Sequence, residues 1–304
     1  MRTARIRNAM FAAAGALALV AAGCRPEPEA APPMEPVNAV VAAPAPPDSA
    51  TARRFAETMA FARTNDLSGR PIGEIMQALG ESLKETPYEA GTLDRNEEET
   101  LVVGFMGFDC VTFVESMLAM ARGVREGAYD YPTFARHLTE QRYRDGRLNG
   151  YCSRLHYFSE WIADNAERGI VQPMTEQLGG VPLEKTLNFM SQHRQSYPLL
   201  AKNDSLFGEL QTIERDLEGL RLFYIPQDRI RTVYGRLQAG DILALATDIE
   251  GLDVSHTGLV YAFGDGRIGL LHASTSAGVT VSPDLQSYVE NNKRQIGIVV
   301  ARPR

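Results

Sequence analysis

The order of the predicted secondary-structure elements constrains the fold of this chain most. In the first part of the chain, apolar residues recur at helical spacing, which predicts helices over residues 51–64, 72–84, 132–141, 155–168 and 206–220. From Arg221 onward the pattern changes to short β-prone runs, which predict strands over residues 222–225, 241–246, 257–263, 267–272, 279–281 and 296–301. Helices first and strands later indicate an α+β fold with a mainly antiparallel sheet.

A cysteine stands at the predicted start of one further helix. Apolar residues recur at helical spacing over residues 111–121, and Asp109 is a suitable N-cap. Cys110 would then occupy the first helical position, where the positive end of the helix dipole favours a thiolate and lowers the pKa of the thiol. A small cysteine buried in a core helix fits these residues equally well.

The N-terminus has the features of a secretory signal. Three arginines lie within residues 1–7, and the apolar run over residues 9–22 is too short for a comfortable transmembrane helix. Residues 21–24 resemble a bacterial lipoprotein cleavage box, so we expect residues 1–23 to be removed and Cys24 to be lipidated. Arg25 favours an outer-membrane anchor facing the periplasm. An ordinary signal peptide cut near Ala22 is the alternative.

Composition separates a tether from a folded domain. Proline, alanine and glutamate dominate residues 24–50, which predicts an extended tether, and residues 51–304 are long enough to bury one large core. The whole chain carries a net charge of −7, and loss of the signal removes three arginines and no acidic residue. An acidic protein without a basic cluster is not expected to bind nucleic acid.

Two of the five histidines fall on neighbouring predicted strands. His256 stands at the mouth of one strand and His272 near the end of the next, with a turn signal between them. If the loop is the three residues 264–266, His272 lies opposite Gly258. The two histidines are then diagonal neighbours on one face, about 7–8 Å apart at the backbone. A two-residue loop would place them on opposite faces.

These residues suggest a cysteine nucleophile. Cys110 would supply the thiolate, His256 would act as base and then acid, and His272 would orient His256. Asp253 is a weaker candidate for the orienting role. In an oxidising compartment, a disulfide between Cys110 and Cys152 is the main structural alternative, although we expect Cys152 to be a free or buried thiol. A zinc site built from the same cysteine and two histidines is the chemical alternative, but the His-Glu-x-x-His spacing is absent from the sequence.

Several stretches, taken in order, resemble a known enzyme family. They are residues 108–115, 154–161, 188–191, 224–226, 240–242, 251–258 and 272–274. From about residue 55 to its end, the chain resembles the NlpC/P60 branch of papain-like cysteine peptidases. Within that branch it resembles the DUF1460 family of N-acetylmuramoyl-L-alanine amidase-like proteins. The resemblance implies a papain-like NlpC/P60 fold, in which the nucleophile-bearing helix packs on an antiparallel sheet with helical additions.

The resemblance also implies an activity. It implies a triad of Cys110, His256 and His272 that cleaves the bond between the lactyl group of N-acetylmuramic acid and L-Ala in muropeptides, without a cofactor or metal. Tyr88 matches a tyrosine that assists the oxyanion, although residues 89–91 depart from the usual Trp-Gly-Gly. A γ-D-glutamyl-diamino-acid endopeptidase and a non-catalytic peptidoglycan-binding lipoprotein are the alternatives.

Other polar residues are candidates for substrate binding or for structural hydrogen bonds. An arginine suits a carboxylate clamp, and the substrate carries several carboxylates. The candidate substrate-binding residues are Arg154, His156, Asn188, Ser191 and Ser255. We expect His137 and His193 at the surface, Asp241 in a turn, and Phe105, Phe108 and Phe113 in the core.

Overall fold

The computed structural model describes residues 48–304, which lie within one unit of the chain. The predicted signal peptide, the lipidation site Cys24 and the tether as far as residue 47 lie outside the described residues. The first helix begins at Ser49, two residues before the predicted start of the domain at residue 51. Within residues 48–304, no helix has the length and apolar character needed to cross a membrane.

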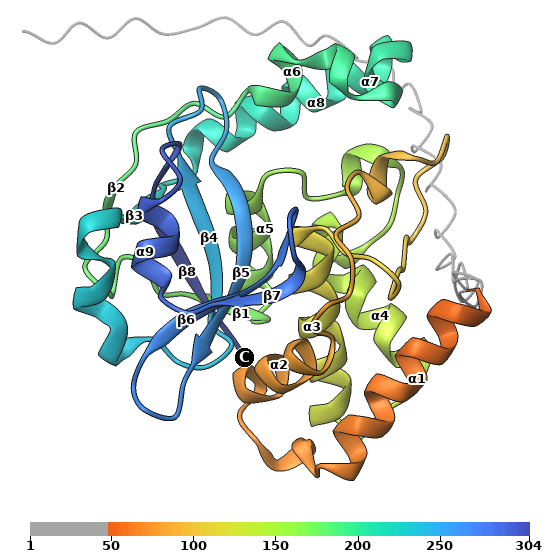
Figure 1. The fold of residues 1–304 in the computed structure, drawn as a ribbon. Helices are drawn as coiled ribbons and strands as arrows, with labels where there is room; N and C mark the ends of the chain where they lie inside the picture. The colour runs from red at the N-terminus through yellow and green to blue at the C-terminus, as the bar shows by residue number, and fades with distance from the viewer. Residues whose placement is uncertain (1–47) are drawn as a thin grey trace, which may run out of the picture. The chain divides into compact units, whose positions relative to one another are not determined.

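The helices cluster in the first two thirds of the chain, as predicted (Figure 1). Helices α1 and α2 precede the cysteine helix α3, and α4 and α5 follow it. Three further helices, α6 to α8, form a separate group, and α9 lies between the last two strands in the sequence. Their bounds are α1 (Ser49–Thr64), α2 (Ile72–Ser82), α3 (Cys110–Arg125), α4 (Tyr131–Arg142), α5 (Phe158–Glu167), α6 (Phe189–Gln192), α7 (Pro198–Lys202), α8 (Asp204–Asp216) and α9 (Leu285–Glu290).

The strands form one eight-stranded sheet in which every paired strand is antiparallel to its neighbour. The order along the sheet is β2-β3-β8-β4-β5-β6-β7, and β1 pairs with β8 beside this path. The predicted mixed fold of helices and an antiparallel sheet is confirmed. The bounds are β1 (Val171–Pro173), β2 (Val181–Pro182), β3 (Phe223–Pro226), β4 (Ile242–Thr247), β5 (Val254–Ala262), β6 (Ile268–Ser274), β7 (Gly278–Ser282) and β8 (Gln295–Pro303).

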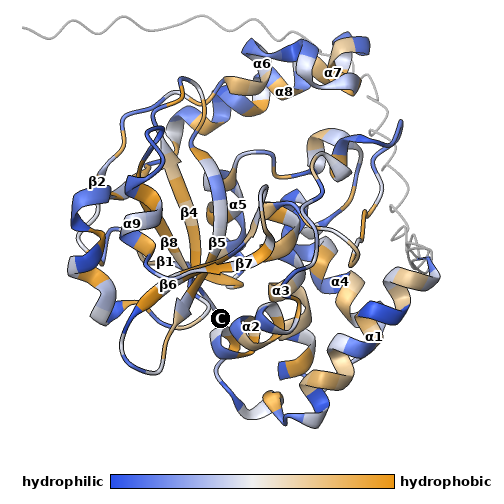
Figure 2. Ribbon diagram, in the orientation of Figure 1, coloured by the Kyte–Doolittle hydropathy of each residue, from blue (hydrophilic) through white to orange (hydrophobic). Residues whose placement is uncertain are grey.

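The sheet separates two hydrophobic cores. On one face, Leu259 and Leu271 pack with residues of α2 and α3. On the other face, Val260 and Leu270 pack with residues of α9. Successive residues of a strand point to opposite faces, so β5 and β6 contribute alternately to the two cores. Figure 2 shows hydrophobic residues along β4 and β6, as expected for strands that are covered on both sides.

The structure differs from the predicted elements in a few places. The helix predicted over residues 155–168 begins at Phe158, because the backbone of Tyr157, its N-cap residue, is extended. The helix predicted over residues 206–220 begins at Asp204, where the side chain of Asn203 caps it. The short elements β1, β2, α6, α7 and α9 were not predicted, because segments of two to six residues give little periodicity.

Candidate active site

Asp109 caps the helix that carries the cysteine. Its Oδ1 accepts a 2.7 Å hydrogen bond from the amide of Thr112, and its own amide donates to Thr112 Oγ1 at 3.0 Å. This reciprocal pair is a capping box, which satisfies two amides at the start of a helix. Cys110 is the first residue of α3, as the sequence predicts.

Helix α3 is buried on all sides in its first three turns. The sequence predicts one apolar stripe, but every residue from 112 to 121 is buried. The helix contacts α2, α4 and the strands β5 and β6. A helix enclosed in this way cannot rotate or slide without disrupting several packed surfaces. Its position against the sheet is therefore well defined at Cys110.

The hairpin between β5 and β6 has the three-residue loop that a shared histidine site requires. Phe263 N donates to Arg267 O at 3.0 Å, and the register pairs Leu259 with Leu271. The next pair in this antiparallel register is Gly258 with His272, so these two residues lie opposite each other. A Cβ at Gly258 would lie 3.0 Å from the Cβ of His272 and 2.9 Å from the carbonyl of Leu271. The predicted register is confirmed, and glycine leaves the space that the imidazole occupies.

The two histidines are in direct contact. Nε2 of His256 lies 2.7 Å from Nδ1 of His272, and the two rings are nearly perpendicular. His272 is 1% exposed, whereas His256 is partly exposed. Two further residues that the sequence did not indicate complete the cluster: Ser282 Oγ lies 3.2 Å from Nε2 of His272, and the ring of Tyr288 packs 4.8 Å from the ring of His272.

Thr257 connects the cysteine to the histidine strand. Its hydroxyl donates a 2.8 Å hydrogen bond to the carbonyl of Cys110. Burial is the largest influence on the Cys110 thiol and raises its pKa, and the charge of Asp109 acts in the same direction. Hydrogen bonds from the amide and hydroxyl of Thr257 oppose this rise without cancelling it. The predicted lowering of the Cys110 pKa is therefore wrong, because burial outweighs the helix terminus.

Burial also keeps both imidazoles neutral. It lowers the pKa of His256 to about 4. It lowers the pKa of His272 to about 3, with a further contribution from neighbouring His256. At neutral pH the Cys110 thiol and both imidazoles are therefore uncharged. This arrangement suits a base that takes the thiol proton during attack, rather than a preformed ion pair.

Tyr88 lies beside the start of α3. It forms a parallel β-bridge with Phe108, and the amide of Glu89 donates to the carbonyl of Phe108 at 2.9 Å. Burial raises the pKa of Tyr88 to about 12, and the charges of Cys110 and Asp109 contribute to this rise. The phenol therefore stays protonated and can donate a hydrogen bond near the sulfur.

Comparison with known proteins identifies the family. A family model described as AmiA-like, N-acetylmuramoyl-L-alanine amidase-like, matches residues 78–298. The chain belongs to this family. The cysteine, both histidines and Tyr88 all fall within the matched residues of this amidase-like, peptidoglycan-related hydrolase family. No curated protein matches the chain.

Several solved structures are similar to the chain. An N-acetylmuramoyl-L-alanine amidase from Bacteroides uniformis is 32% identical, with 77% of this chain and 99% of that chain covered and a TM-score of 0.72. A Bacteroides fragilis protein described as a proposed xylanase is 35% identical, with 73% and 98% covered and a TM-score of 0.69. A Legionella pneumophila protein of the DUF1460 family shares the fold at 18% identity, with 83% and 94% covered and a TM-score of 0.63.

The second cysteine of this amidase-like domain, Cys152, packs against α8. Cys110 and Cys152 are both free thiols, as predicted for Cys152. Cys152 is buried, and its Sγ lies 3.6 Å from the carbonyl of Leu206. The alternative disulfide is therefore not formed. Among residues 48–304, no group of three or more histidine, cysteine, aspartate or glutamate side chains is placed to hold a metal ion.

Most of the other candidate residues of the amidase-like domain are engaged in internal contacts. Arg154 is 5% exposed; its Nη2 donates to Asp94 at 2.6 Å, and its Nε lies 3.3 Å from Glu99. Nε2 of His156 lies 3.0 Å from the carbonyl of Tyr151. Both residues therefore make structural hydrogen bonds, which was the alternative to substrate binding. Their predicted role in substrate binding stays a prediction.

The remaining candidates are Asn188 and Ser191, which are engaged in internal hydrogen bonds, and Ser255, which is exposed. Ser191 Oγ donates to the carbonyl of Asn188, whose amide donates to Gly251 O. Ser255 is exposed, immediately before His256, so it is the candidate best placed to meet a ligand. Asp253 accepts from the amides of Ser159 and Val254. It therefore anchors a loop, and His272 rather than Asp253 is the residue within hydrogen-bond distance of His256.

The predicted positions of the remaining residues are mostly confirmed. Phe105, Phe108 and Phe113 are fully buried, and His193 is exposed. Asp241 accepts a hydrogen bond from the amide of Gln238 in the turn before β4 and is paired with Arg302.

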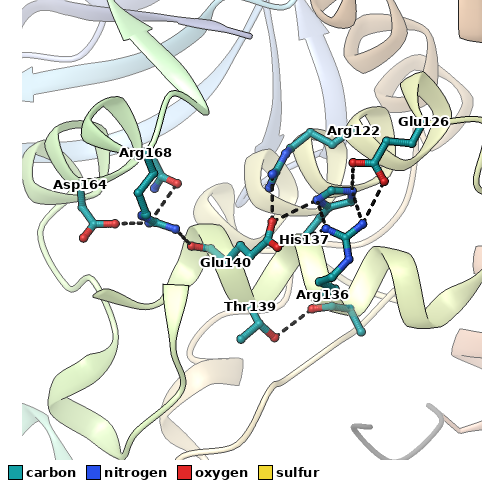
Figure 3. A network of polar contacts seen from close by, with 10 residues as sticks. Arg122, Glu126, Arg136, His137, Thr139, Glu140, Asp164 and Arg168 are labelled. Atoms are coloured by element: carbon teal, nitrogen blue, oxygen red, sulfur yellow. Dashed lines mark hydrogen bonds and ion pairs between the residues drawn. The ribbon is translucent and has the colours of Figure 1, made fainter. Parts of the chain in front are cut away.

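His137 is an exception, because it is 0% exposed rather than at the surface. It lies on α4 within a network of charged residues that links α3, α4 and α5 (Figure 3). Its Nε2 lies 3.1 Å from Glu126, and its Nδ1 lies 3.3 Å from Glu140. Burial is the main influence that lowers the pKa of His137. The prediction failed because Glu126, which follows α3 in the chain, covers this face of α4 together with Arg136 and Glu140 of α4 itself.

Proposed function

We propose that this protein is a cysteine amidase that hydrolyses the N-acetylmuramoyl–L-Ala bond of muropeptides, on a papain-like fold of the NlpC/P60 type. The 2.7 Å contact between His256 and His272 carries this proposal. Thr257, the residue after His256, is hydrogen-bonded to the carbonyl of the capped Cys110, in a chain of an amidase-like family. A base held by a second group and positioned next to a thiol is the arrangement that nucleophilic catalysis needs.

The first half-reaction forms a thioester. Because Nε2 of His256 is engaged with His272, its Nδ1 is the nitrogen available to the thiol. Nδ1 takes the proton of Cys110 while the sulfur attacks the lactyl carbonyl carbon. The resulting oxyanion accepts hydrogen bonds from the amide of Cys110, which is free of an intrahelical partner at the helix start, and from the hydroxyl of Tyr88. The C–N bond then breaks, and His256 gives its proton to the amine of L-Ala.

The second half-reaction regenerates the enzyme. Nδ1 of His256 removes a proton from water, and the hydroxide attacks the thioester carbonyl. The C–S bond breaks, the sulfur recovers the proton from His256, and the muramic acid leaves with a free lactyl carboxylic acid. Charge develops on the sulfur and on His256 together, so each stabilises the other in a site where either charge alone would be costly.

The products of one defined muropeptide test this proposal. Mass spectrometry should show release of the intact peptide from the sugar. Release of a fragment cut after D-Glu would instead indicate the endopeptidase alternative. No turnover, together with failure of Cys110 to react with an electrophile, would indicate the non-catalytic alternative. Xylan hydrolysis would require a pair of carboxylates at the scissile bond, whereas this cluster presents a thiol and two imidazoles.

We further propose that the mature protein is a periplasmic lipoprotein, anchored in the outer membrane through Cys24. The arginine-rich start, the apolar run and the following cysteine support this proposal. Metabolic labelling with a fatty acid should modify the wild-type chain and not a Cys24→Ala variant. Labelling of both chains, or of neither, would contradict lipidation at this cysteine.

A further inference from the structure

We propose that Lys185 is a positioning residue, which holds the β4–β5 connection closed and thereby fixes the start of the strand that carries His256. Lys185 lies between β2 and α6. Its Nζ donates hydrogen bonds to three carbonyl oxygens of the connection, those of Thr247, of Ile249 at 2.8 Å and of Leu252 at 2.7 Å. An ammonium has three N–H donors and no acceptor, so all its donors are engaged and the direction of each bond is fixed.

The three carbonyls come from both ends of the connection. Thr247 is the last residue of β4, and Leu252 precedes β5, which begins at residue 254. Between them, the carbonyl of Gly251 accepts hydrogen bonds from the amides of Asn188 and Phe189. The connection is thus attached to the segment that follows β2, and not only to its own strands. Without the ammonium, three carbonyl oxygens would face one another with no donor, which favours opening of the connection.

A β-bulge lies between this connection and His256. The residue of β4 opposite His256 is Leu245, and the next residue of β4 pairs with Val254. Ser255 therefore has no partner in β4. An extra residue of this kind interrupts the alternation of side chains along a strand, so it can redirect the side chain that follows. In a regular strand, Val254 and His256 would share one face of the sheet.

The two cores show the effect of the bulge. Val254 packs in the same core as Leu259, although an odd number of positions separates them. Val260, which alternates with His256 on the opposite face, belongs to the other core. A slip of the bulge by one residue would turn His256 to the face of Val254, away from His272. The ammonium holds the connection immediately beyond this bulge, so it restrains such a slip.

The connection provides a site for a cation. Three carbonyl oxygens converge on Nζ of Lys185. Burial lowers the pKa of Lys185, while the charges of Asp253 and Asp248 oppose this change and favour the ammonium. The inference rests on the proposed function for its effect on turnover, whereas the hold on the connection can be measured without turnover.

Hydrogen exchange tests this hold directly. In Lys185→Met, which keeps an apolar side chain but removes the donors, the amide of Thr247 should exchange about 10-fold faster, because its 3.2 Å hydrogen bond spans the connection. The amide of Val260, bonded towards the far end of β5, should be unchanged. Lys202→Met is the matched control at an exposed lysine of α7, and it should change neither amide.

Kinetics on a muropeptide test the effect on the base. Lys185→Met should lower kcat about 10- to 100-fold with KM within about 2-fold, because His256 is displaced while the substrate-binding surface is kept. Lys185→Ala should show a similar loss. Propylammonium chloride matches the missing part of the side chain and should restore part of the lost kcat. Tetramethylammonium chloride carries the same charge without an N–H and should restore none.

The inference would be overturned by unchanged exchange at Thr247 in Lys185→Met, by wild-type kcat in that variant, or by a loss in Lys185→Ala that propylammonium does not restore. Wild-type protein without turnover would instead count against the proposed amidase function. Faster exchange at Thr247 in Lys185→Met would, in that case, still support the hold of the ammonium on the connection.

Discussion

The hydroxyl of Thr257 donates a 2.8 Å hydrogen bond to the carbonyl of Cys110, across 147 residues of sequence. The bond joins the first residue of α3 to the residue that follows His256 in β5. The helix and the histidine strand therefore meet at the point where the proposed chemistry takes place. Any change in this contact should alter the position of the sulfur relative to the base.

Thr257→Val removes this hydrogen bond with little change in side-chain volume. We expect a loss of about 1 kcal/mol in the free energy of unfolding. We also expect a 10- to 100-fold fall in kcat, on the order of the effect of a misplaced reacting group. Kinetics and urea denaturation measure the two effects. Thr257→Ser keeps the hydroxyl and should retain most activity; equal activity of the valine variant would show that the contact is not needed for positioning.

Tyr88→Phe tests the proposed oxyanion contact. The phenol stays protonated because burial and nearby charges raise its pKa to about 12. Its removal should lower kcat by up to about 100-fold, towards the lower end of the effect of an oxyanion donor, with a small change in KM. Tyr129→Phe is the control, because that tyrosine packs beside Arg63, remote from Cys110. If the two variants were equally active, the amide of Cys110 would have to stabilise the oxyanion without Tyr88.

The pH dependence of Cys110 alkylation tests the uncharged resting state. Because burial raises the thiol pKa and keeps His256 neutral, the thiolate should be scarce at neutral pH. The rate of reaction with iodoacetamide should therefore still be rising above pH about 8.5, the ordinary thiol value. A plateau between about pH 5 and 7 would indicate a thiolate–imidazolium pair and contradict this electrostatic description.

Activity should also extend to acidic pH. His256 must be unprotonated to act as the base, and its pKa is lowered to about 4. The acidic limb of kcat/KM should thus fall well below pH 6.5, the ordinary histidine value. Measurement of kcat/KM between about pH 3.5 and 8 on a muropeptide checks this. An acidic limb centred near 6.5 would mean that substrate-free His256 is more solvated than the structure indicates.

A buried ion pair supports the helix behind the nucleophile. Arg142 Nε donates to Glu115 at 2.7 Å, and each side chain is 2% exposed. Glu115→Gln leaves the arginine without its counter-charge and should cost about 3–5 kcal/mol in the free energy of unfolding. Glu57→Gln, which affects an exposed pair with Arg54, should cost less than about 1 kcal/mol. Similar losses for the two variants in urea denaturation would contradict this assignment.

Local sequence determined the starting position of the helix and the register of the hairpin. Asp109 and Thr112 form their capping box within one helical turn. Residues 264–266 set the register that brings His256 and His272 to one face. Both features depend on near neighbours in the chain. The sequence therefore predicted the helix start outright, and it predicted the register on the condition of a three-residue loop.

Only the tertiary structure decided the protonation of the site and the identity of its supporting residues. The pKa of Cys110 rises because distant segments enclose α3, an effect that a local helix-terminus argument omits. Thr257 reaches Cys110 through a long-range contact, and Ser282 reaches His272 from a third strand. Burial and hydrogen bonds between segments remote in sequence depend on how whole elements pack. That packing has no local signature in the sequence from which these contacts could be read.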